Sequence, residues 1–312
     1  MLGWFLAAVL LLWVLAERKT TRPDGTLVKT HPYRQMLPYL APKPNSAITY
    51  YDEYVQAEQL LAYIEASREL GKDVDVTDCL LAAIAVALDE VPRLNRFLVG
   101  RRLYQRHARK LSFSALRRKK DRGAEVSGVH LTVDDGWVFD DLHHAVQRLI
   151  AVERSGRRTY TDSELRLTLA LPRPLLALTV AVLKWLDAHN LLPASFIDRD
   201  PLYCSAFLAN LGSIDMRPGY HHLYEWGNCP VFVVAGKIAP MPMVEDGAVV
   251  VRQVLHLRLS FDERIDDGLN ASDAVNAAKA VLEHPFARLG CLRADGSDRV
   301  PLHAPPQLPH AG

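Results

Sequence analysis

Ionisable side chains crowd a nine-residue run near the carboxy-terminal end of the chain, Ser260 to Gly268 (SFDERIDDG). The run leaves a β-like stretch, turns at a glycine and enters a helical stretch. Glu263 would act as a general base if burial removed its carboxylate from water, with Arg264 or Asp267 holding it in place. Alternatively, Glu263 only completes a charge network at the strand–helix junction. Both interpretations stay open, and Gly268 suits the tight turn.

Histidines elsewhere offer a displaced base. His221 and His222 follow Gly219-Tyr220 in a loop that we expect near the same site. Most lone histidines are satisfied core or surface residues, so the remaining candidates are weaker: His130, His143, His144 and His256.

Composition excludes several other classes of function. The four cysteines are far apart, without a CxxC pair or metal-ligand spacing, which predicts no metal site and reduced, buried thiols. A net charge of +1 gives no global field for nucleic acid, and we expect no nucleic-acid partner. Twelve Lys and Arg lie between Arg93 and Arg122. They suit anionic head groups or coenzyme A phosphates, or else a solvated hairpin tip at residues 117–120.

The amino-terminal segment is the most apolar part of the chain. Met1 to Ala16 contains no charged residue and is followed by Glu17, Arg18 and Lys19. At 1.5 Å per residue it reaches about 24 Å, against about 30 Å of hydrocarbon, so a span is marginal. We predict an uncleaved single-pass transmembrane helix and membrane anchor over residues 1–19. The positive-inside rule then places the remaining chain in the cytoplasm, at the inner membrane.

The remaining pattern predicts one α/β domain over residues 46–293, after a linker at 20–45 and before a disordered tail at 294–312. Apolar periodicity and alternation indicate helices at 54–70, 79–88, 139–155 and 272–283, and strands at 111–116, 126–133, 202–208, 231–235 and 248–261. Residues 159–200 form an apolar, proline-broken insertion. We expect it to contact the membrane or a neighbouring subunit.

Four stretches in this domain follow a known order. Ser260 to Gly268 keeps the spacing of a Ser-Phe-Asp-His-Arg-x-x-Asp-Gly signature. Upstream lie a helix that ends in Pro-x-Leu-Asn, an Asn-Leu-Gly strand end and an Asn-x-Pro strand: residues 78–95 (DCLLAAIAVALDEVPRLN), 206–212 (AFLANLG) and 228–236 (NCPVFVVAG). Together they resemble the catalytic domain of the 2-oxo acid dehydrogenase acyltransferases, whose fold is that of chloramphenicol acetyltransferase.

The resemblance implies a two-layer α/β sandwich, a homotrimer with active sites between subunits, and acyl transfer from a coenzyme A or lipoyl thioester. It also implies that Glu263 replaces the catalytic histidine, that Ala209 replaces a hydroxyl that stabilises the oxyanion, and that Asp267 holds the geometry by an ion pair. Ala209, Asn210, Gly212 and Gly268 would shape the substrate channel. The chain shows no lipoyl domain, and we expect no covalently bound cofactor.

Two functions follow from these observations. The first is a membrane-anchored acyltransferase-like protein that transfers an acyl group from acyl-coenzyme A to a lipid or lipid precursor, with membrane lipid as its partner. The second is a catalytically inactive acyltransferase homologue that serves as a scaffold, regulatory subunit or lipid-binding module. They differ in whether Glu263 lies in a channel as a base or only in a salt-bridge network.

Overall fold

The computed structural model describes residues 2–116, 126–155 and 169–303. Its centre is a six-stranded sheet in the order β2-β9-β8-β7-β5-β6. Strand β7 pairs in parallel with both β5 and β8, and the other pairs are antiparallel. The strands are β2 (Ile48–Gln56), β5 (Arg109–Leu116), β6 (Val126–Val133), β7 (Ala206–Asn210), β8 (Val231–Glu245) and β9 (Ala248–Asp262).

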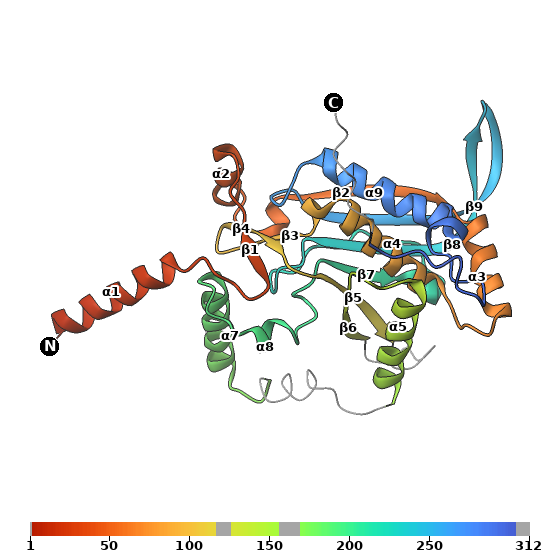
Figure 1. Cartoon of the computed structure of the whole chain (residues 1–312). Coiled ribbons are helices and arrows are strands. Elements are labelled where there is room, and N and C mark those ends of the chain that lie inside the picture. The colour runs from red at the N-terminus through yellow and green to blue at the C-terminus, as the bar shows by residue number, and fades with distance from the viewer. Residues whose placement is uncertain (1, 117–125, 156–168, 304–312) are drawn as a thin grey trace.

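Helices cover one face of this sheet and form the main core with it (Figure 1). They are α3 (Glu58–Glu69), α4 (Val76–Glu90), α5 (Phe139–Arg154), α9 (Gly268–Glu283) and the short α10 (Pro285–Arg288). Helix α4 is buried over eleven consecutive residues, Asp78 to Leu88, as its nearly unbroken apolar run predicts. Asp75 caps it by accepting from the backbone N–H groups of Thr77 and Asp78. The two-layer α/β sandwich is confirmed.

The opposite face of the sheet carries a smaller apolar cluster. Phe207 of β7 stacks on Phe232 of β8 with ring centroids 4.9 Å apart, and Leu223 packs beside them. The long β8–β9 hairpin continues past the sheet as a free arm (Figure 1). Because side chains alternate along each strand, neighbouring residues of the signature strand β9 reach different faces.

Residues 20–45, predicted to be a linker, contain β1 (Gly25–Leu27), α2 (Pro32–Leu40) and the first residues of η1 (Pro44–Ser46). Strand β1 joins β3 (Arg96–Val99) and β4 (Arg102–Arg106) in a second sheet, with η2 (Pro92–Leu94) leading into β3. Arg22 and Asp24 are buried there as an ion pair with Nε and Oδ1 2.8 Å apart. Arg22 also bonds to Asp187 at 2.9 Å, and Asp24 accepts from Asn228 at 3.0 Å. These two contacts fix the segment to the domain, and the linker prediction is corrected.

Two further boundaries differ from expectation. The helix predicted from Tyr54 begins only at Glu58, because residues 48–56 pair with β9. The tail predicted to be disordered from residue 294 is ordered to His303, with Leu302 fully buried and its N–H bonded to the Trp137 carbonyl. Residues 304–312 lie outside the described part.

The amino-terminal helix α1 (Leu2–Arg18) has 17 residues. Across residues 2–116, 126–155 and 169–303, no helix combines the length and the apolar character needed to cross a membrane. The predicted transmembrane helix is therefore not supported. Within the predicted insertion, the structure describes α7 (Arg173–Ala188), α8 (Ala194–Ile197) and the residues from 169 onward. The predicted hairpin tip at 117–120 and residues 159–168 fall outside the described ranges.

Candidate functional site

The signature run turns from β9 into α9 around a buried ion pair. Arg264 donates from Nε and Nη2 to the two carboxylate oxygens of Asp262, at 2.8 and 2.7 Å. Both side chains are almost inaccessible to solvent. A third guanidinium nitrogen donates to the Ala41 carbonyl, so the turn is also fixed to the segment before β2. This bidentate pair shapes the backbone on both sides of Glu263.

Glu263 itself is exposed. Its backbone N–H donates to the Ala47 carbonyl at 3.0 Å, and its carboxylate accepts a long hydrogen bond of 3.4 Å from Thr49 Oγ1. Burial and, to a smaller extent, the Glu263 charge raise the pKa of the nearby Tyr51 phenol. Within one chain, Glu263 therefore lacks the apolar enclosure that the general-base interpretation requires.

Two adjacent aspartates follow, and they differ in role. Asp267 caps α9 by accepting from the Asn270 N–H at 3.3 Å, and Arg34 lies 3.5 Å from it. The Asn270 backbone hydrogen bond is the main cause that lowers the pKa of Asp267. Asp266 is completely buried and meets the guanidinium groups of Arg93, Arg96 and Arg34 at 2.6, 3.3 and 3.8 Å. Asp266 was not predicted as a site residue, although the arginines at 93 and 96 were a signal in the sequence.

Gly268, the first residue of α9, has its nearest neighbour in Tyr51. A Cβ atom on Gly268 would lie 3.4 Å from the Tyr51 hydroxyl. That distance is an ordinary van der Waals contact, and Gly268 has no positive φ, so neither space nor backbone conformation requires glycine at this position.

Three of the four predicted channel residues, Ala209, Asn210 and Gly212, lie at the end of β7. Asn210 donates from Nδ2 to Thr77 Oγ1 at the start of α4, at 3.1 Å. Ala209 packs on the apolar cluster of the opposite face. A Cβ atom on Gly212 would lie 2.6 Å from the Gly236 carbonyl oxygen, so this loop touches β8 directly. Ala209, Asn210 and Gly212 therefore lie together at this end of the sheet.

That group does not meet Glu263 within the chain. Ala209 pairs with Val234, and Val234 pairs with Arg258, five residues before Glu263 on β9. At about 3.3 Å per residue, the strand separates them by about 16 Å. The structure thus places Ala209, Asn210 and Gly212 at the opposite end of the sheet from Glu263, whereas Gly268, the fourth predicted channel residue, lies at the Glu263 end.

His221 and His222 lie over the open face of the sheet. The His221 ring stacks on Phe232 at 3.9 Å with an interplanar angle of 7°, and the Ser260 hydroxyl donates to its carbonyl oxygen. Burial lowers the pKa of the His221 imidazole. His222 is exposed and stacks on His221. Since Thr49 next to Glu263 faces the helices and Ser260 faces away from them, these histidines and Glu263 belong to opposite faces.

The same open face carries a polar cluster that was not predicted from the sequence. Asp52 of β2 accepts from His256 Nε2 at 2.6 Å, from Arg258 Nε at 2.9 Å and from the Tyr220 hydroxyl. Partial burial raises the pKa of Asp52, but these hydrogen bonds outweigh it and lower the value to about 2. A histidine oriented by a carboxylate is an arrangement that general bases use. Asp52 and His256 are 204 residues apart in the chain, so no local sequence motif predicts their pairing.

In the described ranges, no group of three or more His, Cys, Asp or Glu side chains could hold a metal ion. The four cysteines are free thiols and buried. The other histidine–carboxylate pairs among the described residues hold parts of the fold together. The most enclosed joins His143 of α5 to Asp78 of α4 at 3.0 Å inside the core.

Residues 209–289, from the end of β7 through α9, match the family of 2-oxoacid dehydrogenase acyltransferases (catalytic domain). This segment of the chain is similar to the catalytic domain of that acyltransferase family. The resemblance is confirmed for the stretches at 228–236 and 260–268 and for the end of the stretch at 206–212, whereas the stretch at 78–95 lies outside the matched residues.

Curated relatives match only in part. The lipoamide acyltransferase component of the branched-chain alpha-keto acid dehydrogenase complex of Pseudomonas aeruginosa is 36% identical over 80 residues, or 25% of this chain and 17% of the relative. The dihydrolipoyllysine-residue acetyltransferase component of the pyruvate dehydrogenase complex of Staphylococcus aureus is 46% identical over 50 residues, or 16% of this chain and 12% of the relative. The chain thus spans less than a fifth of the length of these relatives.

Solved structures of acyltransferases share the fold over much more of the chain. Dihydrolipoamide acetyltransferase of Azotobacter vinelandii aligns with a TM-score of 0.55 at 16% identity, covering 84% of this chain and 94% of that one. A chloramphenicol acetyltransferase aligns with a TM-score of 0.50 at 12% identity, covering 83% and 99%. At such low identity the likeness establishes the fold, and the chemistry must be argued from the residues.

Proposed function

We propose that this chain is an acyltransferase-like protein that transfers an acyl group from acyl-coenzyme A to a lipid or lipid precursor. The observation that carries the proposal is the match over residues 209–289, since it contains both the β7 end and the signature turn. The coenzyme A thioester is a substrate in this proposal, and no covalently bound cofactor takes part.

The separation of the predicted groups within one chain favours an active site completed by a second copy. Glu263 stands exposed at one end of the sheet and Ala209 to Gly212 at the other. We therefore propose a homotrimer in which Glu263 of one subunit faces the β7 end of its neighbour. Burial at that interface would give Glu263 the enclosure that it lacks in the single chain.

An inactive homologue remains a second candidate, and a specific observation favours it. Ala209 packs in an apolar cluster, so the position where the family resemblance implies an oxyanion donor supplies no hydrogen bond. Exposed Glu263 forms no ion pair with a described residue, so within one chain it has neither the enclosure of a base nor the charge network expected at the strand–helix junction. Such a protein would keep the fold and act as a scaffold, a regulatory subunit or a lipid-binding module.

Acyl-coenzyme A hydrolysis and transfer by the full-length protein separate the two candidates. Release of free thiol is followed over a panel of chain lengths and pH for wild type, Glu263→Gln and His256→Gln. Asp273→Asn, an exposed carboxylate on α9, is the matched control. Turnover that is lost in Glu263→Gln and kept in the control supports transfer with Glu263 as base.

If turnover is lost in His256→Gln and kept in Glu263→Gln, the general base belongs to the cluster around Asp52. If no variant releases thiol faster than buffer alone, and none binds coenzyme A, the result supports the inactive homologue. Light scattering on the same samples tests the trimer, which a monomeric mass would contradict.

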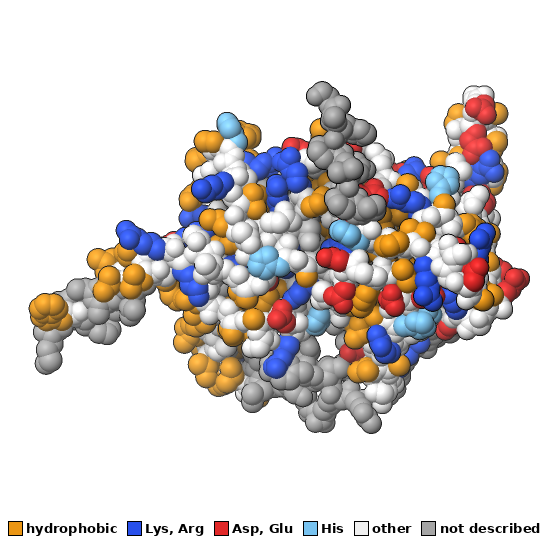
Figure 2. Space-filling view, in the orientation of Figure 1, with side chains coloured by type: hydrophobic (Ala, Val, Ile, Leu, Met, Phe, Trp, Pro, Cys, Tyr) orange, Lys and Arg blue, Asp and Glu red, His pale blue; other side chains and the backbone are white. Residues whose placement is uncertain are grey.

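We further propose that α1 and α7 rest on the cytoplasmic surface of a membrane. Helix α7 buries none of its residues and exposes an apolar stripe at helical spacing, namely Leu175, Leu178, Val182 and Trp185. Helix α1 exposes Trp4, Leu10, Leu11, Trp13, Val14 and Leu15. Figure 2 shows apolar side chains gathered over both helices.

The carboxy-terminal ends of these two helices are fixed to each other. His189, just after α7, lies 3.1 Å from the Glu17 carboxylate of α1, and Arg22 bonds to Asp187 at 2.9 Å. Exposed Arg18, Lys19 and Lys184 stand near this junction and suit anionic head groups. An interfacial site fits amphipathic helices with tryptophan and basic residues at their ends.

A further inference from the structure

Two of the four cysteines meet just before β7 and β8, which run parallel to each other. Phe207 of β7 lies opposite Phe232 of β8. Three residues earlier along the two segments stand Cys204 and Cys229. A register that continues unchanged therefore places these cysteines opposite each other.

A backbone hydrogen bond shows that the register does continue. The Asn228 N–H donates to the Leu202 carbonyl at 3.0 Å, which is the bond that a parallel ladder makes when Tyr203 lies opposite Asn228. Cys204 and Cys229 are the next residues along. Both are buried in the apolar cluster on the open face of the sheet, and their thiols hydrogen-bond to each other.

The spacing of the two segments suits a disulfide bond. Adjacent strands lie about 4.8 Å apart, and a disulfide requires Cα atoms about 4.4–6.8 Å apart with side chains that point toward each other. The register thus brings Cys204 and Cys229 within the range in which an S–S bond forms. Cys79 lies inside α4 and Cys291 follows α10, so neither belongs to these segments.

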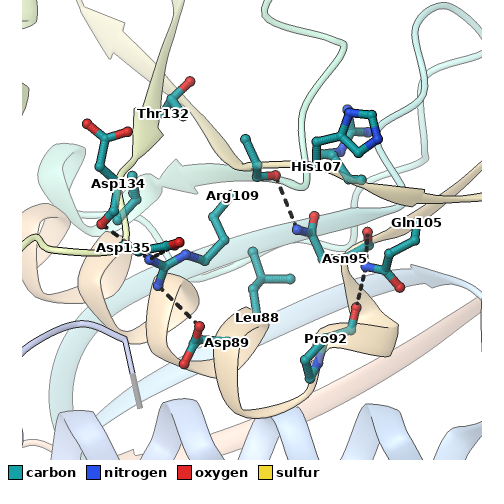
Figure 3. A pocket seen from close by; sticks show the side chains of 13 residues that line it. Leu88, Asp89, Pro92, Asn95, Gln105, His107, Arg109, Thr132, Asp134 and Asp135 are labelled. Carbon is teal, nitrogen blue, oxygen red and sulfur yellow. Dashed lines mark hydrogen bonds and ion pairs between the residues drawn. The ribbon is translucent and has the colours of Figure 1, made fainter. Parts of the chain in front are cut away.

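A buried cation stands beside the pair. Strand β4 ends at Arg106, between Gln105 and His107, whose side chains line a cavity of about 430 Å³ (Figure 3). The Arg106 guanidinium donates instead to the Cys204 carbonyl at 3.0 Å and to Asn228 Oδ1 at 2.7 Å. Its Nε and Nη1 atoms are buried without a hydrogen-bond partner among the described residues. Such a guanidinium stabilises negative charge in its neighbourhood, including that of a thiolate.

The two thiols differ in acidity. Burial raises the pKa of Cys204, but hydrogen bonds with the Cys229 and Ser112 side chains and the charge of Arg106 outweigh it and lower the value. Asp24 lies 3.7 Å from Arg106 Nη1, beyond hydrogen-bond distance, and leaves part of that charge for the thiol. Burial raises the pKa of Cys229. A thiol that ionises readily beside one that does not is an arrangement found in dithiols that cycle to a disulfide.

An oxidant reaches the pair when the chain that covers it opens. From Asp215 to Pro230 the chain forms neither helix nor strand, and most of residues 213–222 are exposed. Segments with few buried contacts open locally at a low cost in free energy. Cys229 lies within this segment, so its opening uncovers the pair. Burial of the two thiols therefore limits the rate of oxidation, and a long incubation overcomes it.

We propose that Cys204 and Cys229 are a modification site that closes into a reversible disulfide in the presence of a peroxide. The Cys204 sulfur attacks one oxygen of hydrogen peroxide, which gives a sulfenic acid and one water. The Cys229 sulfur then attacks the sulfenic sulfur, forms the S–S bond and expels a second water. Two thiols are thus oxidised while one peroxide is reduced to two waters. An added dithiol reverses the reaction by thiol–disulfide exchange.

The bond joins the two ends of residues 205–228. These residues include three of the predicted channel residues and both histidines of the loop: Ala209, Asn210, Gly212, His221 and His222. Oxidation therefore restricts the opening of this segment. The proposal does not depend on acyl transfer, because neither cysteine takes part in the proposed reaction.

Treatment of the native full-length protein with hydrogen peroxide tests the proposal, followed by thiol alkylation under denaturing conditions and peptide mapping by mass spectrometry. We expect two of the four thiols to disappear, the cross-linked peptides to contain Cys204 and Cys229, and dithiothreitol to restore all four. Cys291→Ser, which removes a buried cysteine away from the pair, is the matched control and should form the same disulfide. Cys204→Ser should form no cross-link.

Limited proteolysis of the wild type gives a second readout. Cleavage within residues 205–228 should be at least twofold slower in the oxidised form than in the reduced form, and equal cleavage would overturn the restriction of this segment. Retention of all four thiols after prolonged treatment, under conditions that oxidise free dithiothreitol, would overturn the disulfide itself. So would a cross-link through Cys79 or Cys291, or a sulfinic acid on Cys204 without a cross-link. These measurements on the wild type do not depend on the folding of any variant.

Discussion

The Asp266 carboxylate lies 2.6 Å from Nε of Arg93, which ties the turn before α9 to the turn after α4. Arg96 adds a second contact to the same oxygen at 3.3 Å. The carboxylate is fully buried, whereas about half of the Arg93 side chain is exposed. One buried anion thus joins two segments that are 173 residues apart in the chain.

Replacement of Asp266 should therefore destabilise the fold. Asp266→Ala leaves Arg96 without its charge partner in a partly buried place, and we expect a loss of about 3–5 kcal/mol in the free energy of unfolding. Urea denaturation followed by circular dichroism measures it. The exposed Asp273→Asn should change stability by no more than about 0.5 kcal/mol. Equal stability of both variants would show that the ion-pair cluster is not needed for folding.

The cluster around Asp52 predicts a pH dependence with a defined sign. The pKa of Asp52 is lowered from 3.8 to about 2 in the folded chain. Its stabilising contribution is therefore complete above pH 3.8 and is lost as the pH falls towards 2. We expect Asp52→Asn to melt below wild type at pH 7 and at the same temperature as wild type near pH 2. A difference that persists undiminished at the lower pH would contradict the assignment.

The contact between two glycines predicts a steric effect. Gly212→Ala would bring a methyl group to 2.6 Å from the Gly236 carbonyl oxygen, so the backbone must move. Overpacking of this kind costs about 1–3 kcal/mol. Gly136→Ala is the control, since no atom lies within 4 Å of its new methyl group. Chemical denaturation of the two variants should differ accordingly, and a neutral Gly212→Ala would mean that the β7 end is free to shift.

The exposed stripe of α7 predicts membrane binding that a charge abolishes. Leu178→Asp/Val182→Asp places two carboxylates among apolar side chains, and cosedimentation with phosphatidylglycerol vesicles should fall severalfold. Ala177→Asp adds a charge on a different side of the same helix and should have a much smaller effect. Equal loss in both variants would point to charge alone, and no binding by wild type would exclude the membrane proposal.

Local patterns were sufficient for much of the helical layer and for part of the sheet. The apolar run from Cys79 to Leu88 predicted α4, and alternation predicted the β5–β6 hairpin, whose register pairs Leu111 with Leu131. In both segments, the apolar positions in the sequence are the positions that the fold buries. The signature run likewise predicted the β9–α9 turn.

Strand β2 escaped prediction for a physical reason. Its odd-numbered residues from Thr49 to Val55 face the helices, but only Val55 is both buried and apolar. The strand is specified by its partner β9, which lies about 200 residues later in the chain. Propensity within β2 carries little of that information.

The contacts within the site were harder to predict from the sequence than the strands. The sequence does not distinguish Asp266 from the adjacent Asp267, because tertiary packing alone decides which of the two carboxylates is buried. The pairing of His256 with Asp52 depends on the register between β2 and β9, where Tyr54 lies opposite His256. Spacing along the sequence predicted a turn with charges, and the three-dimensional fold determined which charges meet.

The pairing of β2 with β9 has a consequence for the order in which the chain folds. Tyr50 meets Ser260, so the edge of the central sheet closes a loop of about 210 residues. During synthesis, β2 leaves the ribosome long before its partner exists, and its backbone N–H and carbonyl groups stay unpaired in the meantime. Closing a loop of this length is slow. The nascent chain therefore passes through a long period with an open sheet edge, when chaperones would protect it and aggregation would compete with folding.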